Sequence, residues 1–142
     1  GVCGRPCVWL YDGIIYTARG KPTVCARCIA DGSLAGFLEG AFGLHDADFH
    51  DDVDDDLAEE VMQRTPGFVT FNAFEWPVRD GKPLAFFGHA EEDIVWTTPE
   101  AAEAVRKLYR DEQDEELEGR TSYAVVFKEA GGPRYVAALD LD

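Results

Sequence analysis

Basic residues and long apolar runs are scarce in this 142-residue sequence. Lys and Arg total 13 against 28 Asp and Glu, so the formal net charge is −15 at pH 7. A surface of this charge repels nucleic acid and anionic membranes, so we exclude direct binding to either. No apolar run approaches the ~20 residues that cross a bilayer, and no phosphate-binding glycine loop is present. No secretory signal is visible, although a leader could have preceded Gly1, and we expect a cytoplasmic protein.

Cysteine is also scarce, and its placement is informative. The chain has four cysteines, all within the first 28 residues. They form a Cys-x3-Cys pair, Cys3 and Cys7, and a Cys-x2-Cys pair, Cys25 and Cys28. Two such pairs have the spacing of a tetrahedral zinc site. A metal is also expected because thiolates held close together repel each other until a cation neutralises them. Gly4 suits a tight turn in which backbone N–H groups point at sulfur.

Two other uses of these cysteines stay open. Disulfides in an exported protein would need the same four residues, although a disulfide framework usually ties the whole chain together. A redox Cys-x2-Cys motif usually opens a helix after a buried strand, and the basic Arg27 inside the second pair is compatible with that use. A catalytic zinc is disfavoured, because four thiolates leave no open position.

The acidic residues gather in two segments, Asp46 to Glu60 and Asp111 to Glu118. Such charge favours a cationic partner or a metal ion, but an acidic proteome would produce it for solubility alone. If a basic partner binds, we expect these carboxylates to form its face: Asp46, Asp48, Asp51, Asp52, Asp54, Asp55, Glu115 and Glu116.

The hydrophobic content of 46% is sufficient for a core, and the length predicts one domain spanning residues 1–142. Residues 1–33 would form a zinc knuckle region. Short β-prone runs at 8–11 and 14–17 flank an Asp12-Gly13 turn signal and predict a hairpin.

Further elements follow along the chain. Helices are predicted at 34–41 after a Ser33 cap, at 54–64, and at 99–112 after a Thr98-Pro99 start. Strands are predicted at 68–76, 84–88, 122–128 and 134–139. The expected fold class is therefore α+β, with an N-terminal zinc-tied β-hairpin, short helices, and antiparallel strands that end in a C-terminal hairpin.

Two phrases carry a family resemblance: Cys-Ile-Ala-Asp-Gly-Ser at 28–33 and Arg-Thr-Pro-Gly-Phe at 64–68. With Tyr-Asp-Gly-Ile-Ile-Tyr at 11–16, they make the chain resemble the CbrC family of small bacterial proteins, linked to colicin tolerance, over about residues 3 to 90. The resemblance implies cysteine-based metal binding and a link to toxin resistance. Family members tend to open with Cys-x2-Cys-Gly, in which Cys3 would be the second cysteine. The fourth ligand is then either Cys7 or a cysteine before Gly1.

We therefore expect a zinc-stabilised, non-enzymatic protein that confers tolerance by binding a basic protein toxin. The alternative is an enzyme or thiol-redox protein that uses Cys25 and Cys28 or a carboxylate cluster. His89, beside Glu91 and Glu92, is the acid/base candidate of that alternative.

Overall fold

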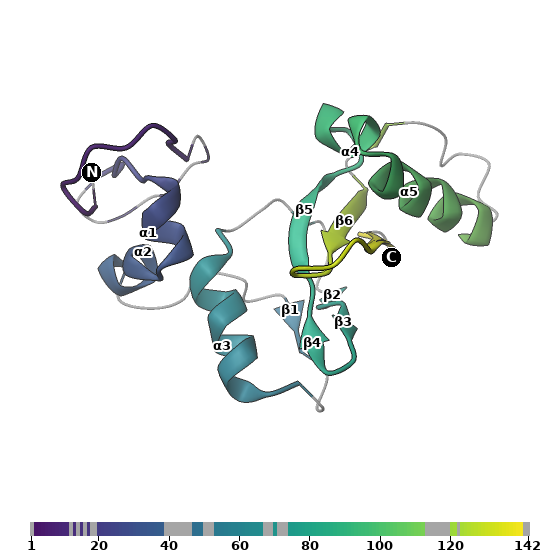
Figure 1. The fold of residues 1–142 in the computed structure, drawn as a ribbon, viewed down its shortest axis with the longest axis horizontal. Coiled ribbons are helices and arrows are strands. Elements are labelled where there is room, and N and C mark those ends of the chain that lie inside the picture. Colours follow the sequence, from purple (N-terminus) through teal and green to yellow (C-terminus); the bar gives the residue numbers. More distant parts are fainter. Residues whose placement is uncertain are drawn as a thin grey trace. The chain divides into compact units, whose positions relative to one another are not determined.

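The computed structural model describes most of the chain. The described residues are 2–11, 13, 15, 17, 20–38, 47–49, 53–66, 70, 74–112, 120–121 and 123–140. The chain divides into two compact units, one formed by Gly1–Leu44 with Asp55–Phe68 and the other by His45–Asp54 with Val69–Asp142. Short helices combine with antiparallel sheets of two and three strands, which confirms the α+β class (Figure 1). The prediction of a single domain is not tested by this division.

The N-terminal unit begins with paired extended segments. Leu10 lies opposite Cys25 in an antiparallel bridge, and Thr17 exchanges two backbone hydrogen bonds with Gly20 at 3.0 and 3.3 Å. These two contacts pair the segment that contains Leu10 and Thr17 with residues 20–25 in the antiparallel direction. The turn predicted at Asp12-Gly13 is not scored, because Asp12 lies outside the described residues. This register places Cys25 directly across from the first extended segment.

Two short helices follow the pairing. Helix α1, Ala26–Ala30, ends where Gly32 adopts a left-handed φ of 72°, a conformation that glycine accepts without strain. Helix α2 is Ser33–Phe37. We predicted Ser33 as the N-cap of this helix, but Ser33 is its first residue and Gly32 is the N-cap. The Asp31 carboxylate accepts a hydrogen bond from the Ser33 N–H at 3.0 Å and so takes the capping role.

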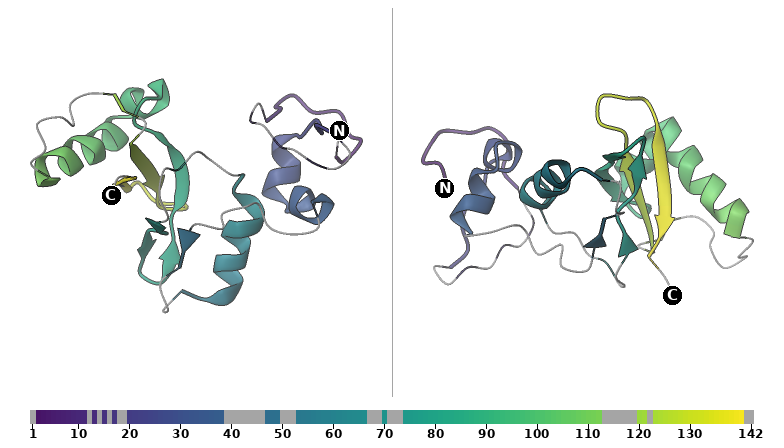
Figure 2. Two further views of the ribbon diagram at one scale, coloured as in Figure 1. Left: turned by 180° about the vertical axis from the view of Figure 1, so that it is seen from behind. Right: turned by 90° about the horizontal axis from the view of Figure 1, so that it is seen from below.

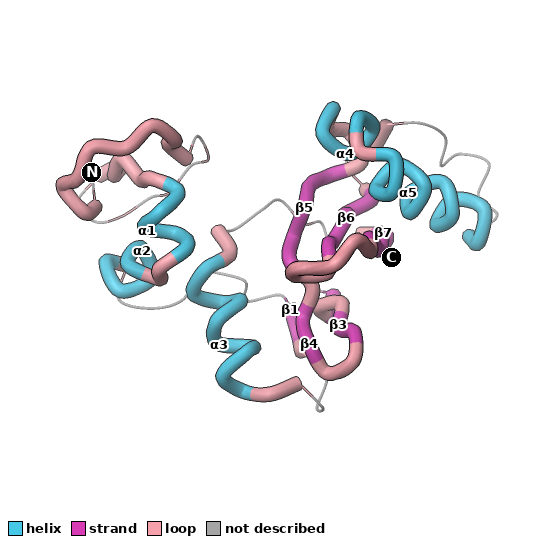
Figure 3. The backbone as a smooth tube through the Cα atoms, viewed as in Figure 1, coloured by secondary structure: helices cyan, strands magenta, loops and turns pink. Residues whose placement is uncertain are grey.

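Helix α3, Asp55–Arg64, closes this unit and packs against α1 and α2. Asp55 and Asp56 lie in its first turn, where the helix dipole favours carboxylates. Leu57, Val61 and Met62 are half-buried, and they form the inward side of this amphipathic helix. All three helices are labelled in Figure 3.

The second unit contains two small β pairs. Strand β1, Ala47–Asp48, pairs in parallel with β2, Phe74–Glu75. Strands β3, Val78–Arg79, and β4, Lys82–Pro83, form a hairpin. The turn between β3 and β4 has positive φ at both central residues, as a two-residue hairpin loop of this hand requires.

A three-stranded antiparallel sheet and two helices complete this unit. The sheet order is β5 (Ala85–His89), β6 (Ala124–Lys128) and β7 (Tyr135–Leu139). Helix α4, Asp93–Thr97, was not predicted, whereas α5, Pro99–Glu112, has the predicted bounds. Helix α5 lies against one face of the sheet, over β6 and β7 (Figure 2).

The core of the second unit occupies both faces of β6. Ala124 and Val126 pack with α4 and α5, whereas the ring of the buried Phe127 meets Trp76 edge-on at 5.2 Å. Trp76 donates its Nε1–H to the Leu84 carbonyl at 2.7 Å. No helix in the described part of the chain is long and apolar enough to span a bilayer.

Candidate metal centre

The Cys-x2-Cys pair lies at the beginning of α1. Cys25 is the N-cap residue with extended backbone angles, and the Cys28 N–H donates to the Cys25 carbonyl at 2.9 Å in the first turn. A turn of helix brings the side chains of residues three apart onto one face. The Cys25 and Cys28 sulfurs are consequently 3.5 Å apart, and both residues are buried.

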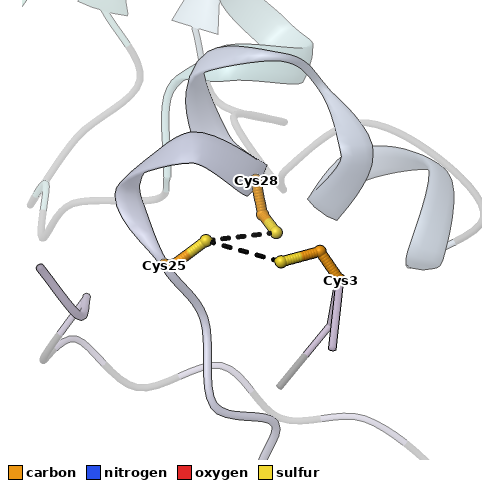
Figure 4. Close-up of side chains that lie close together, drawn as sticks. All are labelled: Cys3, Cys25 and Cys28. Carbon is orange, nitrogen blue, oxygen red and sulfur yellow. Dashed lines mark hydrogen bonds between the residues drawn. The ribbon is translucent and has the colours of Figure 1, made fainter. Parts of the chain in front are cut away.

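The N-terminal segment adds a third sulfur. The Val2 N–H donates to the Thr23 carbonyl at 3.1 Å, which places the next residue, Cys3, beside the pair. The Cys3 sulfur lies 3.8 Å from that of Cys25, and the sulfurs of Cys3, Cys25 and Cys28 are all within 4.8 Å of one another. Figure 4 shows the three side chains converging, two from the start of α1 and one from the N-terminal segment.

Cys7 lies outside this three-sulfur cluster but next to it. Its side chain is exposed, and it lines a pocket of about 390 Å³ together with Cys3 and Cys25. All four cysteines are free thiols. The structure therefore brings three of the four predicted ligands together and places the fourth at the rim of the same pocket.

The thiols differ in their protonation equilibria. The backbone N–H of Cys28 and, after it, the Cys28 thiol lower the pKa of Cys25 to about 7. Burial, followed by the neighbouring thiols, raises the pKa of Cys28 to about 12. Partial desolvation and then Cys25 raise the pKa of Cys7. A thiolate at Cys25, supported by helix N–H groups, is therefore the first metal ligand to be ready near neutral pH.

The spacing of the sulfurs fits a tetrahedral metal ion. A zinc ion with Zn–S bonds of about 2.3 Å separates its sulfur ligands by about 3.8 Å. The two short separations, 3.5 and 3.8 Å, are close to this value before any adjustment. Cys3, Cys25 and Cys28 thus lie close enough to occupy three corners of such a site.

The predicted partner face is described only in part. Asp54 and Asp55, at the start of α3, have exposed side chains, and Asp48 lies in β1. The remaining predicted residues lie outside the described part: Asp46, Asp51, Asp52, Glu115 and Glu116. Between these carboxylates the segment also contains strand β1 and the buried Val53.

The acid/base candidate of the alternative reading is held by its neighbour. The His89 backbone N–H donates to Glu92 Oε1 at 2.7 Å, and His89 Nδ1 lies 3.3 Å from the same oxygen. His89 also meets the ring of Phe86 edge-on at 5.5 Å. These contacts fasten the end of β5 to the turn before α4, which is a structural role.

Sequence reasoning missed two residues around the cysteine pocket, Arg5 and Trp9. Both line it beside Arg27, the residue inside the Cys-x2-Cys pair, and all three side chains are exposed. Trp9 belongs to a run predicted as a strand, and alternation alone does not reveal that its side chain is 78% exposed. The available signal was an apolar run directly after Cys7 in a strongly acidic chain.

Together, the fold and the cluster define an α+β chain with a candidate thiolate metal centre. The chain belongs to UPF0167, an uncharacterised protein family whose model matches residues 1–131. UPF0167 proteins of Mycobacterium bovis and Mycobacterium tuberculosis are each 35% identical over 109 residues, covering 76% of this chain and 58% of theirs. A UPF0167 protein of Pseudomonas aeruginosa is 33% identical over 95 residues, covering 66% and 53% respectively.

The chain thus spans little more than half the length of these bacterial relatives. No solved structure matches it. The predicted resemblance to the CbrC family is corrected: the matching family model is that of UPF0167, and these relatives bear that family name. The link to colicin tolerance came from that resemblance and is not carried further.

Proposed function

We propose that the N-terminal unit is a binding module that depends on a structural zinc ion for its fold. The observation that carries this proposal is the three-sulfur cluster with separations near the edge of a ZnS₄ tetrahedron. Cys3, Cys25 and Cys28 would hold the ion, and Cys7 would complete the set. Bound zinc would neutralise the thiolates and crosslink the N-terminal segment to α1, without supplying a reactive position.

Cys7 is the fourth ligand that the pocket favours. Three residues separate it from Cys3, and the first of them, Gly4, has a left-handed φ of 64°, so the backbone turns sharply between the two cysteines. Cys7 shares the pocket with Cys3 and Cys25 and is close enough to Cys25 for that thiol to raise its pKa. A modest movement of an exposed side chain would add the fourth sulfur.

A second function, thiol–disulfide exchange, is favoured by one observation. Cys25 caps a helix and has a pKa lowered to about 7, whereas Cys28 is buried, an arrangement typical of redox Cys-x2-Cys motifs. Two features weigh against it. Cys25 is only 5% exposed, and a third sulfur lies 3.8 Å from it, so an incoming disulfide has little access to the nucleophile.

Elemental analysis and thiol titration separate the two functions. Protein purified without chelator should contain one zinc per chain, and its thiols should react with a thiol reagent only after chelation. Cys25→Ser and Cys28→Ser should both lose the zinc, whereas Thr23→Ser, beside the site, should retain it. Less than a tenth of an equivalent of zinc, together with a Cys25–Cys28 disulfide, would instead support redox chemistry.

Binding of a basic partner, such as a protein toxin, also stays a proposal. It is supported by the net charge of −15 and by the exposed Asp54 and Asp55. Reversing Asp51, Asp52, Asp54 and Asp55 to Lys should slow association with that partner far more than it speeds dissociation, and salt should remove the difference.

The matched control reverses four exposed carboxylates outside the two acidic segments: Glu75, Asp80, Glu91 and Glu100. Products of neighbouring genes are the candidates to test by pull-down. A neutral or acidic partner, or equal association rates for the reversed protein at low salt, would refute steering by these segments.

A further inference from the structure

The rim of the cysteine pocket carries an unusual run of exposed apolar side chains. Val8 is 90% exposed, Trp9 is 78% exposed and Leu10 is 57% exposed. Isolated exposed apolar residues are ordinary, but a run of three consecutive large ones is a feature of interaction sites. A tryptophan in such a run is a common energetic anchor of protein interfaces.

The backbone of this run presents an unpaired edge. The Tyr11 N–H donates to the Val24 carbonyl at 2.9 Å, and the Ala26 N–H donates to the Trp9 carbonyl at 3.2 Å. In an antiparallel pair, the residue between these two positions directs its own N–H and carbonyl groups away from the partner segment. Leu10 is that residue, and no described residue forms a hydrogen bond with its backbone. An extended peptide can be added at such an edge.

The charge beside the patch is opposite to that of the chain. Arg5 and Arg27 are exposed and line the pocket with Trp9, and neither forms an ion pair within 4.0 Å among the described residues. The hydrogen bonds from Ser33 are the main reason that the pKa of Asp31 is lowered. The positive charges of Arg5 and Arg27 lower it further through longer-range attraction to the same carboxylate. Two guanidinium groups that share one carboxylate leave a local positive charge in a chain of net charge −15.

We propose that Val8–Leu10, Arg5 and Arg27 form a docking site for an extended peptide segment of a partner protein, with apolar side chains next to an acidic one. The peptide backbone pairs with the Leu10 edge, an apolar side chain packs on Trp9, and the carboxylate meets the arginines as a charge-assisted contact. This inference rests on the proposed function, because the metal holds the segment that presents the edge.

The test uses the zinc-loaded full chain and a defined probe, the capped peptide Thr-Val-Glu-Val-Asp-Val-Thr. Two matched probes accompany it: one with Lys for both acidic residues, and one N-methylated at every amide so that neither of its edges can pair as a strand. Binding is followed by tryptophan fluorescence and by calorimetry. Trp9 supplies the signal, because Trp76 is fully buried and Trp96 is half-buried.

Saturable binding of the acidic probe, with a blue shift and at least about tenfold weaker binding of both matched probes, is expected. Trp9→Ala and the Arg5→Ala/Arg27→Ala double variant should each lower its affinity by about tenfold while retaining one zinc. Tyr123→Ala, which removes an exposed aromatic residue of the second unit, should not change it.

The outcomes separate the two proposals. A zinc-loaded chain that binds no probe, binds the lysine probe equally well, or dimerises through Trp9 in sedimentation overturns the docking site alone. A chain that binds the acidic probe equally well with and without chelator contradicts the structural role of the metal. Equal affinity of the Trp9→Ala variant overturns the placement of the peptide.

Discussion

Cys28→Ser is the sharpest perturbation of the proposed metal centre. Cys28 is 1% exposed, and its sulfur lies 3.5 Å from that of Cys25, so the side chain belongs both to the core of the N-terminal unit and to the sulfur cluster. Serine nearly preserves the shape, but its hydroxyl is a poor zinc ligand. The variant therefore separates loss of the metal from loss of packing.

Two free-energy terms contribute to the expected destabilisation. Burying a hydroxyl in place of the thiol costs about 1–3 kcal/mol whether or not metal is present. Zinc at a free concentration a thousandfold above its Kd stabilises the folded unit by about 4 kcal/mol, and this term is lost with the ligand. At about 4–8 °C per kcal/mol for a unit of this size, the metal-dependent loss alone is roughly 20 °C in Tm.

The assay is a thermal melt of wild type and variant, each with zinc and with a chelator. Chelation should lower the Tm of wild type by roughly 20 °C and leave that of Cys28→Ser almost unchanged. Val24→Thr is the matched control, since Val24 is 2% exposed in the same cluster and is not a ligand. Its melt should retain the full response to chelator. An equal response of wild type and Cys28→Ser would refute a structural metal.

Three further results are expected. Zinc affinity should rise with pH, and the slope of the logarithm of affinity against pH should fall by about one above pH 7, as titrations from pH 5.5 to 9 would measure. The slope falls because Cys25, with its pKa lowered to about 7, has no proton left to lose above that pH, whereas Cys28 still has one. Cys7→Ser should weaken zinc binding by at least about tenfold and change the cobalt(II) spectrum from a four-thiolate to a three-thiolate type; an unchanged spectrum removes Cys7 from the ligand set. Trp76→Phe should destabilise the second unit by about 2 kcal/mol through the unpaired Leu84 carbonyl, equally with and without chelator in denaturant unfolding.

The elements that the sequence predicted well have strong local signals. Helix α5 begins at Pro99 after Thr98 and carries buried Ala101, Ala102 and Val105 on one face, so its start and its inward side are both encoded locally. The turn between β3 and β4 also has a local basis, because its central residues Asp80 and Gly81 both have the positive φ that the turn requires.

The missed elements lack a local signal. Strand β1 consists of Ala47–Asp48 and depends on a distant partner, because Ala47 pairs with Phe74 of β2, 27 residues further along. Helix α4 is only five residues long and has no side-chain cap that would mark its start. Similarly, spacing gave the four candidate ligands but not their geometry. The Val2–Thr23 hydrogen bond, which is not visible in the sequence, places Cys3 in the cluster ahead of Cys7.

The two units differ in the material available for a core, and this difference supports the proposed metal in the N-terminal unit. Among the described residues, the buried cluster of that unit comprises Val24, Cys25, Cys28, Leu34 and Ala35, without a large aromatic side chain among these five. The second unit buries Trp76 and Phe127 fully, beside an apolar helix face. Because apolar burial contributes about 25 cal/mol per Å², a core of such small side chains offsets little of the entropy lost on folding. Small domains of this kind usually need a disulfide or a metal. Two of these five described side chains are thiols that face a third thiol, that of Cys3. The residues that supply little apolar volume are therefore the same ones that can supply a metal crosslink.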